Sequence, residues 1–142
     1  MTDQTTYCKF LISTVTGLAY VNIKQIPNEK LVFLNDWKES RNEDSIIALT
    51  WRHFLDYPDQ PEWLLRFPMV KASLRAMDML TELLLEKHPE RPPLKKFAVA
   101  GASKRGWTSW LVASVDPERI KGFVLTTDHN FRFLSFGNLG SV

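Results

Sequence analysis

The sequence has little cysteine and little histidine. Cys8 is the only cysteine among the 142 residues, and there are three histidines. A single thiol cannot form a disulfide within the chain, and no cluster of His or Cys surrounds it that could hold zinc. We therefore expect Cys8 to be an ordinary small buried or half-buried thiol. We also expect no metal site and no cofactor.

Long apolar runs and blocks of like charge are also absent. No uninterrupted apolar run approaches the roughly 18 residues that a transmembrane helix needs, so we expect no membrane span. Residues 1–21 contain no small-residue cleavage site after an apolar core, so no signal peptide is seen and the compartment stays open. The 18 basic and 16 acidic residues are scattered and sum to a net charge of +2. That pattern argues against nucleic acid as a partner.

What is present suits one α/β domain over residues 1–142. Apolar residues make up 44% of the chain, enough for a core. Apolar spacing predicts three helices, and runs of β-branched, aromatic or wholly apolar residues predict three strands. Since strands and helices alternate over long spacings, we expect right-handed crossovers and a parallel sheet covered by helices. The helices are expected over 43–56, 68–87 and 104–115, and the strands over 18–26, 97–100 and 120–127.

The strand at 97–100 and the turn after it are the most informative part of the chain. The strand is wholly apolar and is expected to be buried on both faces. The turn reads Gly-x-Ser-x-x-Gly and places Ser103 between a strand and a helix, as in the nucleophile elbow of a hydrolase. Gly101 would let the two elements approach closely, and the backbone N–H of Lys104 would face a developing oxyanion. The alternative is that Ser103 only caps the helix, and both interpretations stay open.

Two basic side chains follow this serine. Lys104 and Arg105 could hold an anionic group of a substrate beside Ser103 or could form an ion pair within the protein. Basic residues at a helix N-terminus oppose the helix dipole, so their presence needs a compensating partner. Of the two interpretations we favour the ion pair.

The turn resembles that of a known family. The sequence Gly-Ala-Ser-Lys-Arg-Gly-Trp-Thr, residues 101–108, resembles the elbow of the PhoPQ-activated pathogenicity-related family, which includes autocrine proliferation repressor proteins. The resemblance covers about residues 15–125 and leaves the tail, 126–142, as a divergent ending. The other matching segments keep their order along the chain: Lys24–Asn28, Arg41–Asp44, Trp51–Asp56, Glu62–Lys71, Arg75–Asp78 and Val115–Arg119.

The resemblance implies a function as well as a fold. It implies an α/β-hydrolase fold with three α/β/α layers, with Ser103 in the nucleophile position and the Lys104 N–H as oxyanion donor. The substrate would then be a small ester or acyl compound. Because some members of the family are described as secreted growth-inhibitory signals, the alternative is a non-catalytic secreted protein that binds a cell-surface partner.

The resemblance also predicts that the catalytic machinery here is partial. In α/β-hydrolases the acid and the histidine follow the nucleophile on later strands, and only 39 residues follow Ser103. Asp128 and His129 come in the right order. Adjacent residues at one strand end point in different directions, however, so the Asp128 carboxylate would be poorly placed to orient the His129 imidazole. We therefore expect a fragment of the fold that is inactive alone, with neither His53, His88 nor His129 within reach of the Ser103 hydroxyl.

Overall fold

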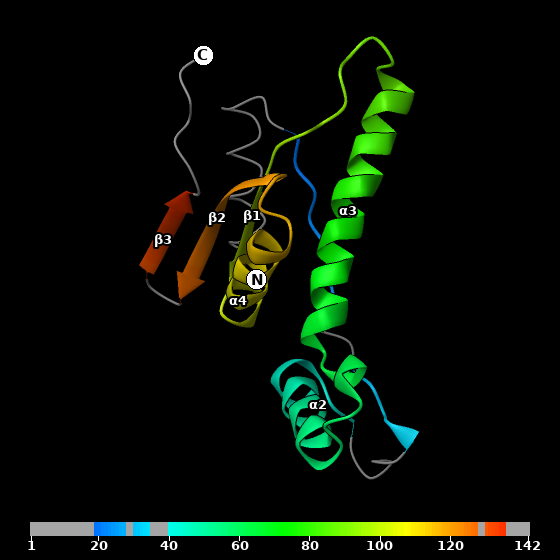
Figure 1. The fold of residues 1–142 in the computed structure, drawn as a ribbon, viewed down its shortest axis with the longest axis vertical. Coiled ribbons are helices and arrows are strands. Elements are labelled where there is room, and N and C mark those ends of the chain that lie inside the picture. The colour runs from blue at the N-terminus through cyan, green and yellow to red at the C-terminus, as the bar shows by residue number, and fades with distance from the viewer. Residues whose placement is uncertain (1–18, 28–29, 35–39, 128–129, 136–142) are drawn as a thin grey trace, which may run out of the picture.

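The computed structural model of the chain describes residues 19–27, 30–34, 40–127 and 130–135. Figure 1 shows α4 lying against β1 and β2, α3 running beside α4, and α2 at the N-terminal end of α3. The elements follow the order α2 (Glu43–Asp56), the short 3-10 helix η2 (Pro61–Trp63), α3 (Arg66–Lys87), β1 (Phe97–Ala102), α4 (Lys104–Val115), β2 (Ile120–Thr127) and β3 (Asn130–Ser135).

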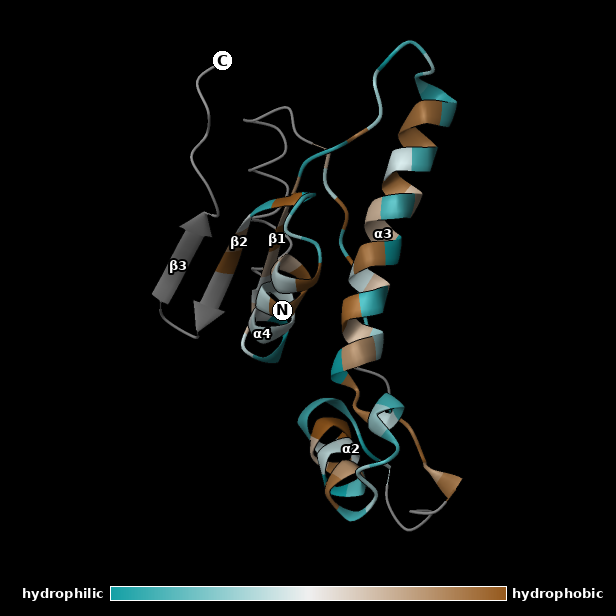
Figure 2. Ribbon diagram, in the orientation of Figure 1, coloured by the Kyte–Doolittle hydropathy of each residue, from teal (hydrophilic) through white to brown (hydrophobic). Residues whose placement is uncertain are grey.

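The three predicted helices are confirmed. α2 and α4 have the expected bounds, and Figure 2 shows apolar and polar residues alternating along α2 and α3. α2 begins after Asn42, whose backbone N–H donates to the Ser45 Oγ at 2.9 Å, while the Ser45 hydroxyl donates to the Asn42 carbonyl at 2.6 Å. α3 begins two residues earlier than expected. Pro68 then lies in its first turn, where a missing N–H costs no helical hydrogen bond.

The sheet is mixed, with the strand order β1-β2-β3. β1 and β2 pair in parallel, as predicted, with Ala98 opposite Gly122. β3 pairs antiparallel with β2, with Val124 opposite Phe133, so the expectation of an all-parallel sheet was wrong. Two strands joined by a connection this short can only run antiparallel. β3 lies in the tail, where no strand was predicted.

Among the described helices, α4 lies against one face of the sheet, and α3 packs beside α4. Phe97 and Val99 of β1 are half-buried against the core, whereas Ala98, Ala100 and Ala102 are exposed. The expectation that this strand is buried on both faces was therefore wrong for the described residues. A run of apolar residues shows only that a strand can be buried. Which of its faces are buried depends on the elements that pack against it. The structure mixes helices with a small sheet, and three α/β/α layers are not shown.

The core lies where α3 and α4 meet the sheet. Phe123 and Ile120 of β2 are 1% and 0% exposed, and Val112 of α4 is 0% exposed. The cluster of buried residues comprises Val70, Met77, Val112, Ala113, Ile120 and Phe123, and Leu74, Phe97, Val99 and Leu111 pack against it.

The strand predicted over residues 18–26 was also wrong, since the described residues 19–26 form no strand. This segment instead packs through its C-terminal end against α2. The Pro27 carbonyl accepts a hydrogen bond from the Glu43 N–H at 3.0 Å, and Ile26 and Pro27 line a hollow with Ile46 of α2. β-propensity describes a side chain's fit to a sheet, and without a neighbouring strand it does not produce one.

Arg119 ties α3 to the connection between α4 and β2. Its Nη1 donates to the Asp78 Oδ1 at 2.7 Å, and its Nε donates to the Asp116 carboxylate. The hydrogen bond from Arg119 is the first cause that lowers the pKa of Asp78 from its ordinary value, and Arg75 on the same helix adds to it. The Arg119 pKa is raised by hydrogen bonds to Asp78 and then Asp116.

The close approach of β1 and α4 predicts the effect of Gly101→Ala. A Cβ at this position would lie 2.4 Å from the Arg105 carbonyl oxygen, so one of the two backbones would have to move. We expect the variant to lose about 1–3 kcal/mol of unfolding free energy, the usual cost of overpacking. Urea denaturation of both chains measures this.

A control for this substitution lies on the same strand. Ala100→Ser changes an exposed side chain on the other face of β1 and should stay within about 0.5 kcal/mol of wild type. Equal stability of Gly101→Ala and Ala100→Ser would contradict the close approach.

The carboxylate of Asp78 predicts a pH dependence of stability. Because its pKa is lowered in the folded state, it contributes stability above the ordinary aspartate range, and that stability is lost as the pH falls through the folded pKa. Asp78→Asn should therefore be less stable than wild type at pH 7, and the difference should shrink as the pH falls from about 5 to about 3. Urea denaturation at several pH values measures it.

Asp56→Asn, which removes the carboxylate of the exposed pair with Arg52, is the control and should show a smaller difference. A gap between wild type and Asp78→Asn that does not change with pH would count against the ion pair.

Candidate functional site

Ser103 lies between the end of β1 and the first residue of α4, as the sequence predicts. Its backbone has φ 51° and ψ −121°, a conformation that non-glycine residues rarely adopt. The side chain is exposed, and its hydroxyl makes no capping hydrogen bond to the helix. An ordinary N-cap serine has extended backbone and uses its oxygen to cap. The capping interpretation of Ser103 therefore does not describe this turn.

The residues on either side of Ser103 are placed as a sharp strand-to-helix turn requires. Gly101 lies against the Arg105 backbone, so the expectation that it allows a close approach is confirmed. Lys104 is the first residue of α4, and its N–H is one of the donors that have no acceptor within the helix. A donor at this place can stabilise negative charge that develops beside Ser103.

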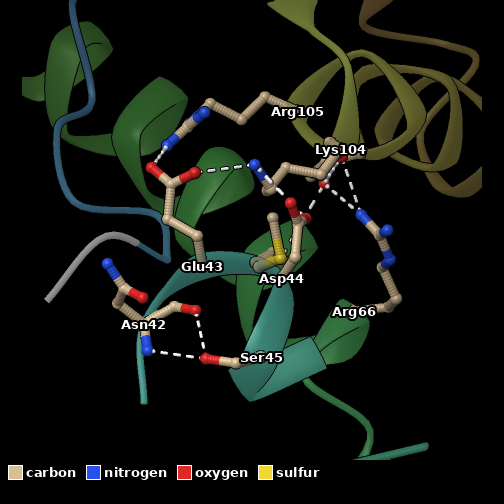
Figure 3. A network of polar contacts seen from close by, with 9 residues as sticks. Asn42, Glu43, Asp44, Ser45, Arg66, Lys104 and Arg105 are labelled. Carbon is tan, nitrogen blue, oxygen red and sulfur yellow. Dashed lines mark hydrogen bonds and ion pairs between the residues drawn. The ribbon is translucent and has the colours of Figure 1, made fainter. Parts of the chain in front are cut away.

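The side chains of Lys104 and Arg105 form an ion-pair network with α2, shown in Figure 3. The Lys104 Nζ donates to the Glu43 Oε2 at 2.7 Å and lies 3.3 Å from the Asp44 Oδ1. The Arg105 Nη2 donates to the Glu43 Oε1 at 2.8 Å. The favoured interpretation of these basic residues, an internal ion pair, is what the structure shows. A role of Arg105 in substrate binding stays a prediction.

The network shifts the titration of its members. The hydrogen bond from Lys104 is the largest cause that lowers the pKa of the Glu43 carboxyl, with Arg105 adding to it. The same contact raises the pKa of Lys104, and Asp44 contributes further. Both shifts favour the charged forms, so the pair is ionised across the neutral range.

Arg66, the first residue of α3, holds the same turn from a second side. The residue is 8% exposed, and its Nη1 donates to the Lys104 carbonyl at 2.7 Å and to the Thr108 Oγ1 at 3.4 Å. The guanidinium carbon lies 4.0 Å from the ring centroid of Trp107. Its Nε has no hydrogen-bond partner among the described residues, and burial lowers the pKa of the group.

The histidines that the structure describes are engaged away from Ser103. His53 shares a hydrogen bond of 3.1 Å with Gln60 and stacks on Trp63, with 4.0 Å between ring centroids. His88 lies beside Glu90 after the end of α3. Neither interacts with Ser103, as expected of both, whereas Asp128 and His129 lie outside the described residues.

Other features of the described part of the chain do not extend this site. Residues 19–27, 30–34, 40–127 and 130–135 contain no group of three His, Cys, Asp or Glu side chains arranged to hold a metal. An open apolar hollow of about 220 Å³ lies between the segment around Pro27 and the start of α3, and Ser103 does not line it. None of the helices in the described ranges has the length and apolar character needed to cross a bilayer.

Sequence reasoning missed two residues of this network. Glu43 and Arg66 appeared only as members of the family-like segments Arg41–Asp44 and Glu62–Lys71. Each lies far along the chain from its partner, Lys104. The two basic residues at a helix N-terminus predicted that an acidic partner exists. The sequence around them could not show which acidic residue it is.

Comparison with known proteins gives one family. A family model described as PhoPQ-activated pathogenicity-related protein matches residues 2–127, starting earlier and ending slightly later than the resemblance seen in the sequence. The chain is 41% identical to autocrine proliferation repressor protein A of Dictyostelium discoideum over 112 residues, which cover 78% of this chain and 22% of that protein. The chain thus spans about a fifth of the length of that relative. No solved structure matches it.

The family model covers most of the chain and includes the whole turn from β1 to α4 with Ser103. The chain therefore belongs to the PhoPQ-activated pathogenicity-related protein family.

Proposed function

We propose that the chain carries the nucleophile elbow of a serine hydrolase of the α/β-hydrolase type. The observation that carries the proposal is the backbone of Ser103, with φ 51° and ψ −121° at the junction of a parallel strand and a helix. Such a conformation costs on the order of 1–3 kcal/mol and persists where the surrounding structure imposes it, most often at functional sites. A serine hydroxyl exposed on a strained strand-to-helix turn is the arrangement that α/β-hydrolases use for attack.

In the proposed reaction the Ser103 Oγ attacks the carbonyl carbon of an ester or related acyl compound. The serine proton passes to a base, the carbonyl oxygen becomes an oxyanion beside the Lys104 N–H, and the alcohol leaves with a proton. Water then hydrolyses the acyl-serine and restores the hydroxyl. The base and the acid that orients it would come from outside the described residues.

The alternative is a non-catalytic protein of the same family that binds a partner at a cell surface. Two observations favour it. The name of the Dictyostelium relative describes a repressor of proliferation, and the described residues bring no imidazole to Ser103. In that case the turn would serve the scaffold alone, and the protein would be secreted.

A fluorophosphonate probe, which reacts with activated serines, separates these functions. On the intact natural protein we expect labelling that falls to background in Ser103→Ala, because only an activated nucleophile reacts at a useful rate. Ser114→Ala is the matched control, since it removes an exposed serine from α4, the helix that follows Ser103, and it should label as wild type does. An unlabelled wild-type protein, or labelling that survives Ser103→Ala, would favour the non-catalytic alternative.

The 142-residue polypeptide by itself should hydrolyse p-nitrophenyl acetate no faster than its Ser103→Ala variant. Without a base at hydrogen-bond distance, the serine keeps close to its unactivated reactivity. Initial rates for the two polypeptides at equal concentration measure this. Turnover that disappears in Ser103→Ala would show that this chain supplies its own base, and His129→Ala would then be the next variant to assay.

A further inference from the structure

Two strained backbone positions lie at opposite ends of one ion-pair network. Within the described residues, positive φ at non-glycine residues occurs at Gln25, Glu43 and Ser103. Glu43 has φ 42° at the first residue of α2, and Ser103 has φ 51° directly before α4. The Glu43 carboxylate binds the side chains of Lys104 and Arg105, the two residues that follow Ser103.

Both oxygens of the Glu43 carboxylate are used in this contact. Oε2 accepts from Lys104 and Oε1 from Arg105, so one side chain of α2 bridges consecutive residues of α4. The Lys104 side chain is only 10% exposed. A lysine that is buried to this degree and paired cannot rotate freely, and its backbone is restricted with it.

Arg66 fixes the same residue through its backbone. Its Nη1 donates to the Lys104 carbonyl at 2.7 Å from the side of α3. Lys104 is thus held at its side chain by α2 and at its carbonyl by α3. Because Ser103 is bonded to Lys104, these contacts limit the backbone angles that Ser103 can adopt.

The charge of Glu43 has a specific effect at this place. Lys104 and Arg105 put two positive charges on the first turn of α4, where the helix dipole already favours negative charge. Glu43 and, more weakly, the 80% exposed Asp44 compensate them. If Glu43 were neutral, Lys104 would gain by turning toward water, and the first turn of α4 would loosen.

We infer that Glu43 is a positioning residue for Ser103: by bridging Lys104 and Arg105 it holds the turn in the conformation that exposes the serine hydroxyl. Glu43 does not touch the reacting atoms, and it acts through the first turn of α4. The catalytic consequence of this inference rests on the proposed hydrolase function, whereas its structural consequence does not.

The structural consequence is tested by hydrogen exchange in the intact natural protein. The Trp107 N–H donates to the Ser103 carbonyl at 3.1 Å, so its exchange rate reports opening of the turn. In Glu43→Gln, which keeps the size of the side chain and removes its charge, we expect about tenfold faster exchange for the peptide that contains Trp107, from the loss of a charge-assisted hydrogen bond. Asp56→Asn, at the other end of α2, is the matched control and should exchange as wild type does.

Two further variants make the test specific to the network. Glu43→Asp keeps the charge with one methylene less and should exchange at an intermediate rate, which also decides the question if Glu43→Gln fails to fold. In a Lys104→Met background there is no ammonium for Glu43 to hold, so Glu43→Gln should change the exchange rate less than it does in wild type. Exchange equal to that of Asp56→Asn in both Glu43 variants would overturn the inference.

The catalytic consequence is measured as the rate of fluorophosphonate labelling in folded protein. If wild type labels at Ser103, Glu43→Gln should label about tenfold more slowly at temperatures well below its unfolding transition. An unchanged rate would overturn the positioning role while leaving the proposed hydrolase intact. If wild type does not label while Glu43→Gln still speeds exchange at Trp107, the hydrolase proposal fails and the structural inference stands.

Discussion

The close contact between Gly101 and the backbone of Arg105 is the constraint on which the site depends. A Cβ at residue 101 would lie 2.4 Å from the Arg105 carbonyl oxygen, so the strand can pass this close to the helix only with glycine there. β1 then ends at Ala102 and α4 begins at Lys104, which leaves one residue, Ser103, to change direction. The positive φ of Ser103 is the local result of that reversal.

The charges on the first turn of α4 determine which side chains pack beside it. Two basic residues in its first turn oppose the helix dipole, and the acidic start of α2 compensates them from 61 and 62 residues away. A second long-range pair, Arg119 with Asp78, secures α3 41 residues away along the chain. These partners belong to the short segments that resemble the family, Arg41–Asp44, Arg75–Asp78 and Val115–Arg119. Segments that are separate in the sequence thus supply the side chains that connect one element to another.

The turn and its supports suit a function that needs an exposed, fixed hydroxyl. A serine that caps a helix has extended backbone, and its hydroxyl oxygen accepts a hydrogen bond from the first turn. The backbone of Ser103 is not extended, and its hydroxyl makes no such bond. The strain at such a residue persists only where neighbouring contacts over-determine it, and here α2 and α3 both bind Lys104. The two proposed functions differ in whether an activating base completes this arrangement.

The sequence by itself determined the elements whose signals are local. Helical spacing and flanking prolines predicted α2, α3 and α4 to within two residues, and the small residues around Ser103 predicted a turn from strand to helix. Tertiary structure alone decided that β3 joins the sheet, which face of β1 is covered, and which acid meets Lys104. The segment at 19–26 has β-propensity but forms no strand, and β3 forms where none was predicted. The physical reason is that helical hydrogen bonds close within four residues, whereas strand pairing, burial of a face and ion pairs need partners whose distance along the chain no local pattern encodes.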